Sequence, residues 1–491
     1  MNFLGIDIGT SGCKALVFDA SGTQLAAAQR EYNVRLTDDG GAELDSAEVL
    51  DGCIAVIADA ASRAGRGTVS AIAISCQGEA FTPVDAMGRP LAAAMVSSDT
   101  RAVEEARAWP AEFGAERLYE ITGHTAHPLF TLFKLLWLKR RRPDVWRNAA
   151  KFLCFEDLLQ SRLGLDPAMA WPLAGRTMMF DVRRHEWSGE ILGRIGLAPA
   201  RLARPLASGS AAGAIPHALT DELGLARNAC IVCGGHDQPC GALGAGVTEP
   251  GAAMYATGTV ECITPAFDRP AFTPALRANN ICTYDHAVTG MYTTVAYSLT
   301  GGNILKWYRD QFAPGRDYGA VLETAAQEPT RLLVLPYWTP SGTPYFDVHT
   351  PGAIIGLRLG TTRGEILRAL LEGVAMEMRL NLEILHESGC AISQLRAIGG
   401  GAKSPFWTQL KADVLGRPVT TLNVTEAGCL GAAMLACSSV TGTPLRELAR
   451  VWVTPQGTID PRPAVARHYE EQFVRYRQFY PAVRAMAGAQ G

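Results

Sequence analysis

The sequence predicts an α/β protein built from two related halves, each of which opens with a β-hairpin, with a cleft between the halves. Its 491 residues are enough for two or three domains with sizeable cores. Residues 3–8 and 15–18 alternate as strands around a Gly-Thr-Ser-Gly turn. Residues 252–256 and 260–264 repeat this arrangement around a Thr-Gly-Thr turn, which indicates a second half of the same design.

The remaining elements follow from local periodicity. Residues 128–140 predict a helix, because Leu129, Leu132, Phe133 and Leu136 recur at i, i+3, i+4 and i+7. Three arginines close this helix before a proline, as expected for a helix C-terminus. Further strands are expected at residues 25–32, 69–75, 230–233 and 395–398.

Composition excludes several classes of protein. The net charge of −3 gives no electrostatic footprint for nucleic acid or an anionic membrane. No apolar stretch approaches the roughly 18 residues of a membrane span, and the N-terminus lacks a signal-peptide pattern, so a cytoplasmic location is expected. Cys230 and Cys233 have C-x-x-C spacing without a second pair, which favours buried thiols in a reducing compartment over a metal site.

The turn after the first strand is the first candidate site. Asp7 ends that strand, where a carboxylate can hold Mg²⁺ directly or through water. The turn offers backbone N–H groups and the hydroxyls of Thr10 and Ser11, and Lys14 adds a cation for phosphate. A plain hairpin with a buried aspartate remains the alternative.

Two glycine-containing segments in the second half could face the same ligand. Thr257 and Gly258 form a hairpin turn that is ordinary alone but could clamp a triphosphate together with the first turn. Residues 399–405 read Gly-Gly-Gly-Ala-Lys-Ser-Pro, a loop between a strand and a helix that starts at Pro405 after the N-cap Ser404. This loop fits neither the P-loop nor the dinucleotide pattern, because Ala402 and Ser404 stand where each requires glycine.

Asp237 follows the buried strand 230–233 and is the candidate general base. A carboxylate at a strand end can accept a proton from a substrate hydroxyl, and nearby helix N–H groups would favour its ionised form. The alternative is that Asp237 only caps the helix whose first turn contains Pro239. His236 is expected to be structural, as a histidine beside a buried strand usually is.

In order and spacing, these motifs resemble the FGGY carbohydrate kinases, which have two actin-like ATPase (ribonuclease H-like) domains flanking a central cleft. The resemblance implies a transferase that uses ATP and Mg²⁺ on a small sugar, with no nucleic-acid or membrane partner. A homodimer would be unsurprising for this fold. The matching segments are Asp7-x-Gly9-Thr10-Ser11-x-x-Lys14, Lys134-Leu135-x-Trp137-Leu138, Gly235-x-Asp237-Gln238, Thr257-Gly258-Thr259, Pro344-Tyr345-Phe346-Asp347, Gly352-x-Ile354-x-Gly356-Leu357 with Glu365 and Glu372, Gly399-Gly400-Gly401-Ala402 and Glu426-Ala427-Gly428-x-x-Gly431-Ala432.

The resemblance also implies that the two domains bind different ligands. Residues 1–245 would form the sugar-binding domain, with the base Asp237 near its end, and residues 246–491 the nucleotide-binding domain. The sugar would contact Gln77, Gly78, Glu79, Asp237, Gln238 and, less directly, Asp99. The nucleotide and its phosphates would contact Asp7 (through Mg²⁺), Thr10, Ser11, Lys14, Thr257, Gly258, Gly302, Gly401, Ala402 and Pro405.

The substrate expectation is a ketopentose such as xylulose. Xylulose kinases commonly carry Met-His where this chain has Gly78-Glu79, and glycerol kinases carry Arg-Glu there and a tyrosine in place of Leu129. Gly78 would leave room for a sugar, and Glu79 would repel an acid such as gluconate. Another ketose or an erythritol-like polyol remains open. So do a sugar-independent actin-like ATPase and a non-catalytic sugar or nucleotide sensor.

Overall fold

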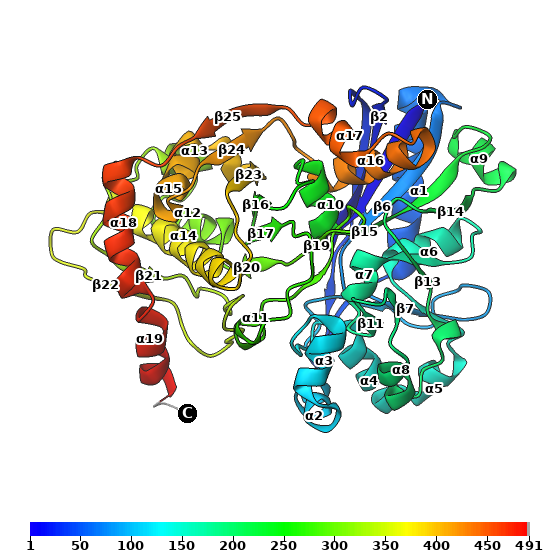
Figure 1. Ribbon diagram of the computed structural model, residues 1–491, viewed down its shortest axis with the longest axis horizontal. Coiled ribbons are helices and arrows are strands. Elements are labelled where there is room, and N and C mark those ends of the chain that lie inside the picture. Colours follow the sequence, from blue (N-terminus) through cyan, green and yellow to red (C-terminus); the bar gives the residue numbers. More distant parts are fainter. Residues whose placement is uncertain (489–491) are drawn as a thin grey trace.

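Two six-stranded sheets organise the computed structural model, which describes residues 1–488 (Figure 1). In chain order, each sheet begins with a three-stranded antiparallel meander. Two further strands lie parallel to the first strand of the meander, and an antiparallel strand forms the far edge. This common topology confirms the two related halves. The first sheet runs β14 (Ala211–Ala214), β15 (Cys230–His236), β6 (Val69–Cys76), β1 (Asn2–Ile8), β2 (Gly12–Asp19), β3 (Gln24–Glu31); the second runs β20 (Ala296–Ser298), β17 (Glu261–Pro265), β16 (Ala252–Thr257), β23 (Gln394–Ile398), β24 (Val419–Leu422), β25 (Pro455–Ile459).

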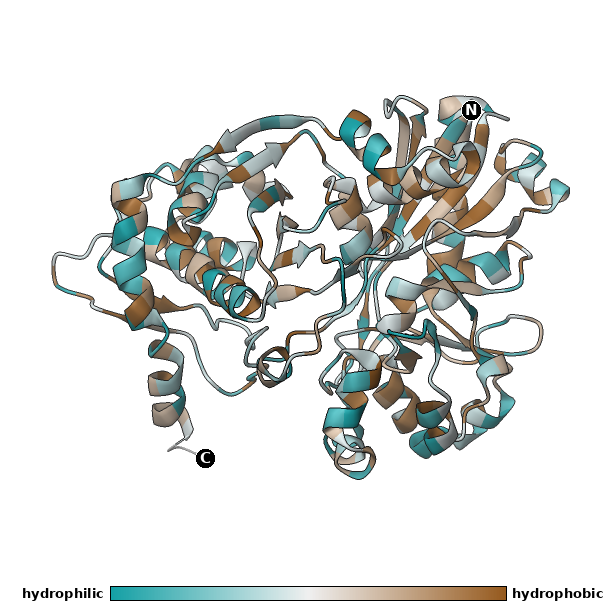
Figure 2. Cartoon of the chain, in the orientation of Figure 1, coloured by the Kyte–Doolittle hydropathy of each residue, from teal (hydrophilic) through white to brown (hydrophobic). Residues whose placement is uncertain are grey.

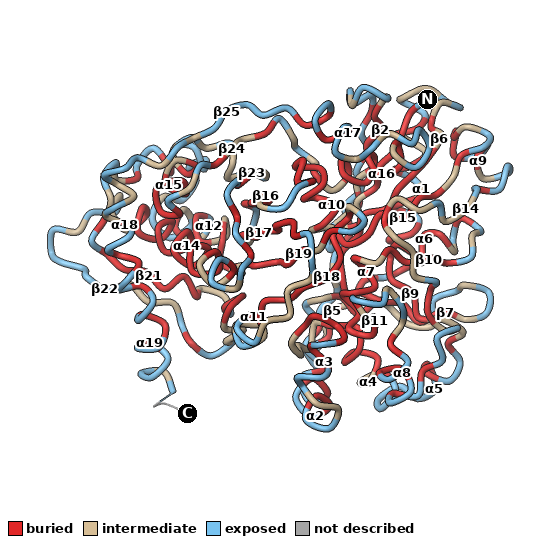
Figure 3. The backbone as a smooth tube through the Cα atoms, viewed as in Figure 1, coloured by how far each residue is buried: buried red, intermediate tan, exposed pale blue. Residues whose placement is uncertain are grey.

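The central strands of the first sheet are buried on both faces. Six of the seven residues of β1 are buried, as expected for a strand with helices on each side. Figure 2 shows apolar residues concentrated on these strands, and Figure 3 shows the same strands buried. Helix α1 (Ser46–Gly65) packs on β2 and β3 and starts at an N-cap aspartate, Asp45.

The other face of the first sheet is covered by a helix from the second half of the chain. Helix α16 (Ala427–Thr441) lies against β1 and β6 and crosses α10 (Asp237–Gly244), which Figure 1 shows in orange and green. Glycines allow this close approach: a Cβ at Gly5 would lie 1.8 Å from a carbonyl oxygen of α16, and one at Gly431 would lie 1.9 Å from Cys240 O. The C-terminal signature therefore packs on the N-terminal sheet.

The predicted helix at 128–140 is shifted. Helix α4 spans Thr131–Arg141, because the chain is still extended at the N-cap Phe130. Lys134 is buried in α4, and its Nζ donates hydrogen bonds to the carbonyl oxygens of Met95 and Val96, both at 3.1 Å. The lysine of this motif therefore ties α4 to a neighbouring loop.

The second sheet packs against a long helix, α14 (Arg363–Glu387), which opens with a capping box between Thr362 and Glu365. Helix α15 (Pro405–Leu415) packs on α14, and its N-cap Ser404 accepts a hydrogen bond from Trp407 N, as predicted. Other helices of this half are α12 (Gly302–Phe312), α13 (Tyr318–Leu322), α17 (Leu445–Trp452), α18 (Pro463–Tyr476) and α19 (Phe479–Gly488).

The prediction of buried thiols is confirmed for Cys233, whereas Cys230 is half-buried. All twelve cysteines are free thiols, and all except Cys230 are buried. Within residues 1–488, no helix combines the length and the hydropathy that a bilayer crossing requires.

Candidate active site

Three parallel strands bring the N-terminal site residues to one edge of the first sheet. Strands β1, β6 and β15 are parallel neighbours, with Ile8 opposite Cys76 and Cys76 opposite His236. Because carboxyl ends of parallel strands meet at the same edge, the segments that follow them converge there. The Gly9–Gly12 turn, the segment that starts at Gln77, and Asp237 therefore share one end of the sheet.

Gln77 holds the first turn in place. Its Nε2 donates to Gly9 O at 3.0 Å, and its Oε1 accepts from Thr10 Oγ1 at 3.2 Å. Tyr32 OH also donates to Gly9 O, at 2.8 Å. The Gln77 amide is therefore hydrogen-bonded to the turn, whereas the sequence suggested that it would bind a sugar hydroxyl. Thr10 and Ser11 remain exposed on the turn.

Asp7 lies between this turn and the N-terminus of α16. Asp7 Oδ1 accepts a hydrogen bond from Ser75 Oγ at 2.7 Å, and a Cβ at Gly428 would lie 3.0 Å from the carboxylate. Burial raises the pKa of Asp7, because a carboxylate removed from water is harder to ionise. Lys14 Nζ forms an ion pair with Glu426 Oε1 at 2.8 Å. Residues 426–428 of the C-terminal signature therefore contact the residues on both sides of the first turn, Asp7 and Lys14.

The donor set around Asp7 fits a magnesium ion that keeps most of its water. Among residues 1–488, no group of three or more His, Cys, Asp or Glu side chains could hold a metal ion. Mg²⁺ in phosphotransfer sites is usually held by one or two carboxylates together with waters and substrate phosphates. Asp7, near the end of β1 before the Gly9–Gly12 turn, fits that arrangement.

A cavity of about 330 Å³ adjoins the second turn. Four predicted residues line it: Thr257, Gly258, Gly302 and Gly401. Ala402 and Pro405 are not among its lining residues. Sequence reasoning missed the apolar walls, because no local motif marks them: Leu305, Tyr318, Leu322 and Trp407. These side chains suit the planar face of a heteroaromatic base.

Gly401 is expected to be required for this cavity. A Cβ at Gly401 would lie 2.2 Å from Thr257 Cγ2 and 3.2 Å from Trp407, whereas a Cβ at Gly400 meets nothing within 4 Å. We expect Gly401→Ala to displace the second turn and raise the KM for ATP by about tenfold. Steady-state kinetics and the melting temperature would be compared with those of Gly400→Ala. An unchanged KM for ATP in Gly401→Ala would contradict this role.

Asp237 is the first residue of α10. Its side chain is 33% exposed, the N-cap of the helix is His236, and no side-chain capping bond is present. The capping alternative is therefore wrong. Burial, together with the charges of Asp7 and Glu79, raises the pKa of Asp237 to about 8. The expectation that helix N–H groups would keep Asp237 ionised is corrected, since desolvation and two carboxylates outweigh them.

A buried arginine that the sequence did not single out neutralises Glu79. Arg176 follows α7 (Trp171–Gly175), and its Nε donates to Glu79 Oε1 at 2.6 Å. Its guanidinium also lies over the ring of Phe130, 5.0 Å from the centroid, and contacts His124 Nε2 at 3.2 Å. The expectation that Glu79 would repel an acidic substrate loses its basis, because the charge is paired.

The other sugar candidates have protein partners. Asp99 is buried, and its carboxylate accepts hydrogen bonds from Arg101 and from Ala42 N, so it has a structural role. Gln238 Oε1 accepts from Thr264 Oγ1 at 3.4 Å and stays partly exposed. Gly78 lies against the ring of His236, which occupies the space that the sequence reserved for a sugar.

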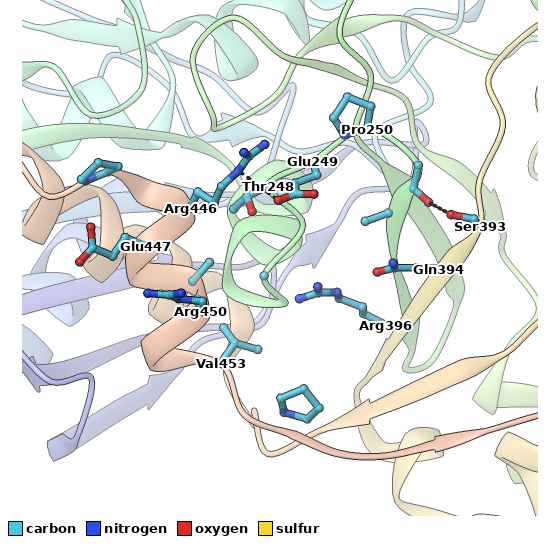
Figure 4. A pocket seen from close by; sticks show the side chains of 16 residues that line it. Thr248, Glu249, Pro250, Ser393, Gln394, Arg396, Arg446, Glu447, Arg450 and Val453 are labelled. Atoms are coloured by element: carbon cyan, nitrogen blue, oxygen red, sulfur yellow. Dashed lines mark hydrogen bonds and ion pairs between the residues drawn. The ribbon is translucent and has the colours of Figure 1, made fainter.

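A separate crevice of about 600 Å³ lies between α17, the start of β23 and the loop after α10 (Figure 4). Arg396, Arg446 and Arg450 line it, and Arg446 pairs with Glu249 at 3.1 Å. This crevice is lined by none of the predicted site residues, so we do not assign the active site to it despite its volume.

Comparison with protein families matches both halves of the chain. Residues 2–244 match the N-terminal domain of the FGGY family of carbohydrate kinases, and residues 253–440 match the C-terminal domain of that family. The chain is 26% identical to the xylulose kinase of Staphylococcus xylosus, over 97% of this chain and 99% of that protein. It is 31% identical to the glycerol kinase of Methylibium petroleiphilum, over 91% and 93% of the two chains.

Solved structures share the whole architecture. The xyloylose kinase of Brucella ovis aligns over 99% of this chain and 100% of its own, with a TM-score of 0.91 and 28% identity. The xylulose kinase of Rhodospirillum rubrum aligns over the same shares with a TM-score of 0.91 and 26% identity.

Proposed function

The chain belongs to the FGGY family of carbohydrate kinases and is a phosphotransferase acting on a sugar hydroxyl; we propose that its acceptor is a ketopentose such as xylulose. The observation that carries the proposal is the convergence of Asp237, the first turn and the Glu79–Arg176 pair at one edge of the sheet. A hydroxyl-rich ligand placed there would meet a base, an ion pair and the phosphate turn together. The xylulose kinase relatives support the choice of sugar.

In this proposal residues 1–245 hold the sugar and residues 246–491 hold ATP. Asp237 accepts the proton of the attacking hydroxyl, since Glu79 and Glu426 are each paired with a cation, whereas the neighbour of Asp237 is His236. Thr10, Ser11 and Lys14 approach the terminal phosphates from one side, and Thr257 and Gly258 from the other. Mg²⁺ held near Asp7 would neutralise phosphate charge and, being close, lower the pKa of Asp237.

The two lobes also serve to exclude water. Water in the site would compete with the sugar hydroxyl for the phosphoryl group, so productive transfer needs the lobes closed over both ligands. The glycine contacts between α10 and α16 form a close-packed joint along the helix that begins with Asp237. We propose that this joint keeps the base fixed relative to the first turn.

An ATP-consumption assay over a panel of acceptors tests the substrate. We expect turnover that depends on added sugar and a kcat/KM that is highest for a ketopentose such as xylulose. The panel includes aldoses, glycerol, erythritol and gluconate, with Asp237→Asn as the control enzyme. A higher kcat/KM for another acceptor would overturn the ketopentose assignment, and ATP hydrolysis at one rate with every sugar would overturn the proposed reaction.

Gluconate is included in that panel because the charge of Glu79 is paired. Arg176 is buried beside Glu79, so a sugar acid would meet a neutral ion pair instead of a lone carboxylate. A sugar acid is therefore the second candidate acceptor. Arg176→Leu would separate the two, because it should impair a sugar acid more than an uncharged sugar.

A further inference from the structure

Three side chains form a line of close polar contacts that ends on Asp237. His236 Nδ1 is hydrogen-bonded to Tyr284 OH at 2.9 Å, and His236 Nε2 lies 3.2 Å from Asp237 Oδ1. His236 is 5% exposed and Tyr284 is fully buried, so water does not compete for the hydrogen bond between them. None of the matched motifs accounts for this line, which starts in the second half of the chain.

The partners fix which nitrogen of His236 carries the proton. When Asp237 is ionised, as a base must be, it can only accept a hydrogen bond, so Nε2 is then the donor at this contact. Nδ1 of a neutral imidazole then accepts, and Tyr284 OH is the donor. Burial lowers the pKa of His236, and the charge of Arg176 lowers it further, which keeps the ring neutral. Burial also raises the pKa of Tyr284, which keeps its hydroxyl proton in place.

The surrounding residues hold the ring in one orientation. A Cβ at Gly78 would lie 2.9 Å from His236 Cδ2 and 3.0 Å from Nε2, so the glycine is what admits the ring. Arg176 lies over the ring of Tyr284, 5.5 Å from its centroid. Tyr284 belongs to the short strand β18 (Tyr284–Asp285), and Thr283 N donates to Gly123 O at 2.8 Å, which anchors this segment on the first lobe.

We propose that His236, oriented by Tyr284, is a positioning residue for the base Asp237. Its Nε2–H occupies Oδ1 and leaves Oδ2 directed at the hydroxyl of the acceptor. The inference rests on the proposed function, because it assigns how the base of that reaction is aimed. Because Tyr284 comes from the second half of the chain, the aim of the base depends on contact between the two halves.

Kinetics of matched variants test the positioning role. We expect His236→Phe to lower kcat by about 30- to 100-fold, since a misplaced catalytic group costs up to about two orders of magnitude. The KM for sugar and the stoichiometry of ATP binding should stay within about threefold of wild type. The stoichiometry gives the concentration of folded, ATP-binding enzyme from which kcat is calculated. His236→Gln places an amide donor near the position of Nε2 and should recover kcat to within about fivefold of wild type. Equal kcat in His236→Phe and wild type, or no recovery in His236→Gln, would overturn the proposal.

A double-mutant cycle tests whether Tyr284 acts through His236. Tyr284→Phe should lower kcat by about three- to tenfold in the wild-type background and have no further effect in His236→Phe. Additive losses would overturn the role of Tyr284.

A spectroscopic test does not depend on which sugar is the substrate. ¹⁵N NMR of histidine-labelled full-length protein, assigned with His236→Gln, should show His236 as the neutral Nε2–H tautomer at about pH 9, above the pKa of Asp237. The Nδ1–H tautomer or a charged ring at that pH would overturn the inference even in an active enzyme. The predicted tautomer in an enzyme that phosphorylates no sugar in the panel would instead count against the proposed function alone.

Discussion

Asp237→Asn should lower kcat for sugar phosphorylation by about 1,000-fold, within the range that general-base catalysis contributes. The substitution keeps the size of the side chain and removes its ability to accept a proton at any accessible pH. The hydroxyl would then attack without a base, while the phosphate turns remain intact. The measurement is the initial rate with the preferred sugar at saturating ATP.

The control for Asp237→Asn is nucleotide binding. Asp237 lies at the end of the first sheet, whereas the apolar cavity beside the second turn is lined by other residues, so calorimetry should give a Kd for ATP within about twofold of wild type. Turnover within tenfold of wild type would contradict the assignment of the base. A loss of ATP affinity would instead indicate a structural effect of the substitution.

Lys411→Met should produce the largest loss of stability. Lys411 is buried, its Nζ lies 2.7 Å from Glu261 Oε1, and it also contacts Thr257 Oγ1. Its ammonium group lies 4.4 Å from the ring centroid of Tyr255. Removing the cation leaves a fully buried carboxylate without its partner, which costs about 3–5 kcal/mol of unfolding free energy. Urea denaturation followed by fluorescence would measure the change.

The same variant should weaken nucleotide binding, because Lys411 holds the threonine of the second turn. The matched control is the double variant Lys411→Met/Glu261→Gln, in which neither charge remains buried. It should regain at least half of the lost stability, because an uncharged amide is cheaper to bury than an unpaired carboxylate. A single variant as stable as wild type would show that Glu261 is not charged in the folded protein.

Local sequence patterns were sufficient for the two hairpins, the parallel strands that follow them and the positions of the motifs. The β-branched and apolar runs at 3–8 and 252–256 specify central strands by themselves, and the glycine turns between strands mark their ends. Ser404 and Pro405 likewise predicted the start of α15 from local sequence alone, without information on tertiary contacts. The start of α4 could not be found this way, since extended backbone before Thr131 overrides an apolar pattern that continues through Leu129.

The sequence by itself determined most of the candidate site residues, with Arg176 and Tyr284 as exceptions, whereas only the tertiary structure decided what each of them faces. Glu79 is paired with Arg176, and Gln77 binds the turn, because segments far apart in the chain meet at one sheet edge. The pKa of Asp237 is raised because burial and the neighbouring carboxylates act together, and neither can be read from adjacent residues. Hydrogen bonds and desolvation depend on distance in space, so they appear only once the chain is folded.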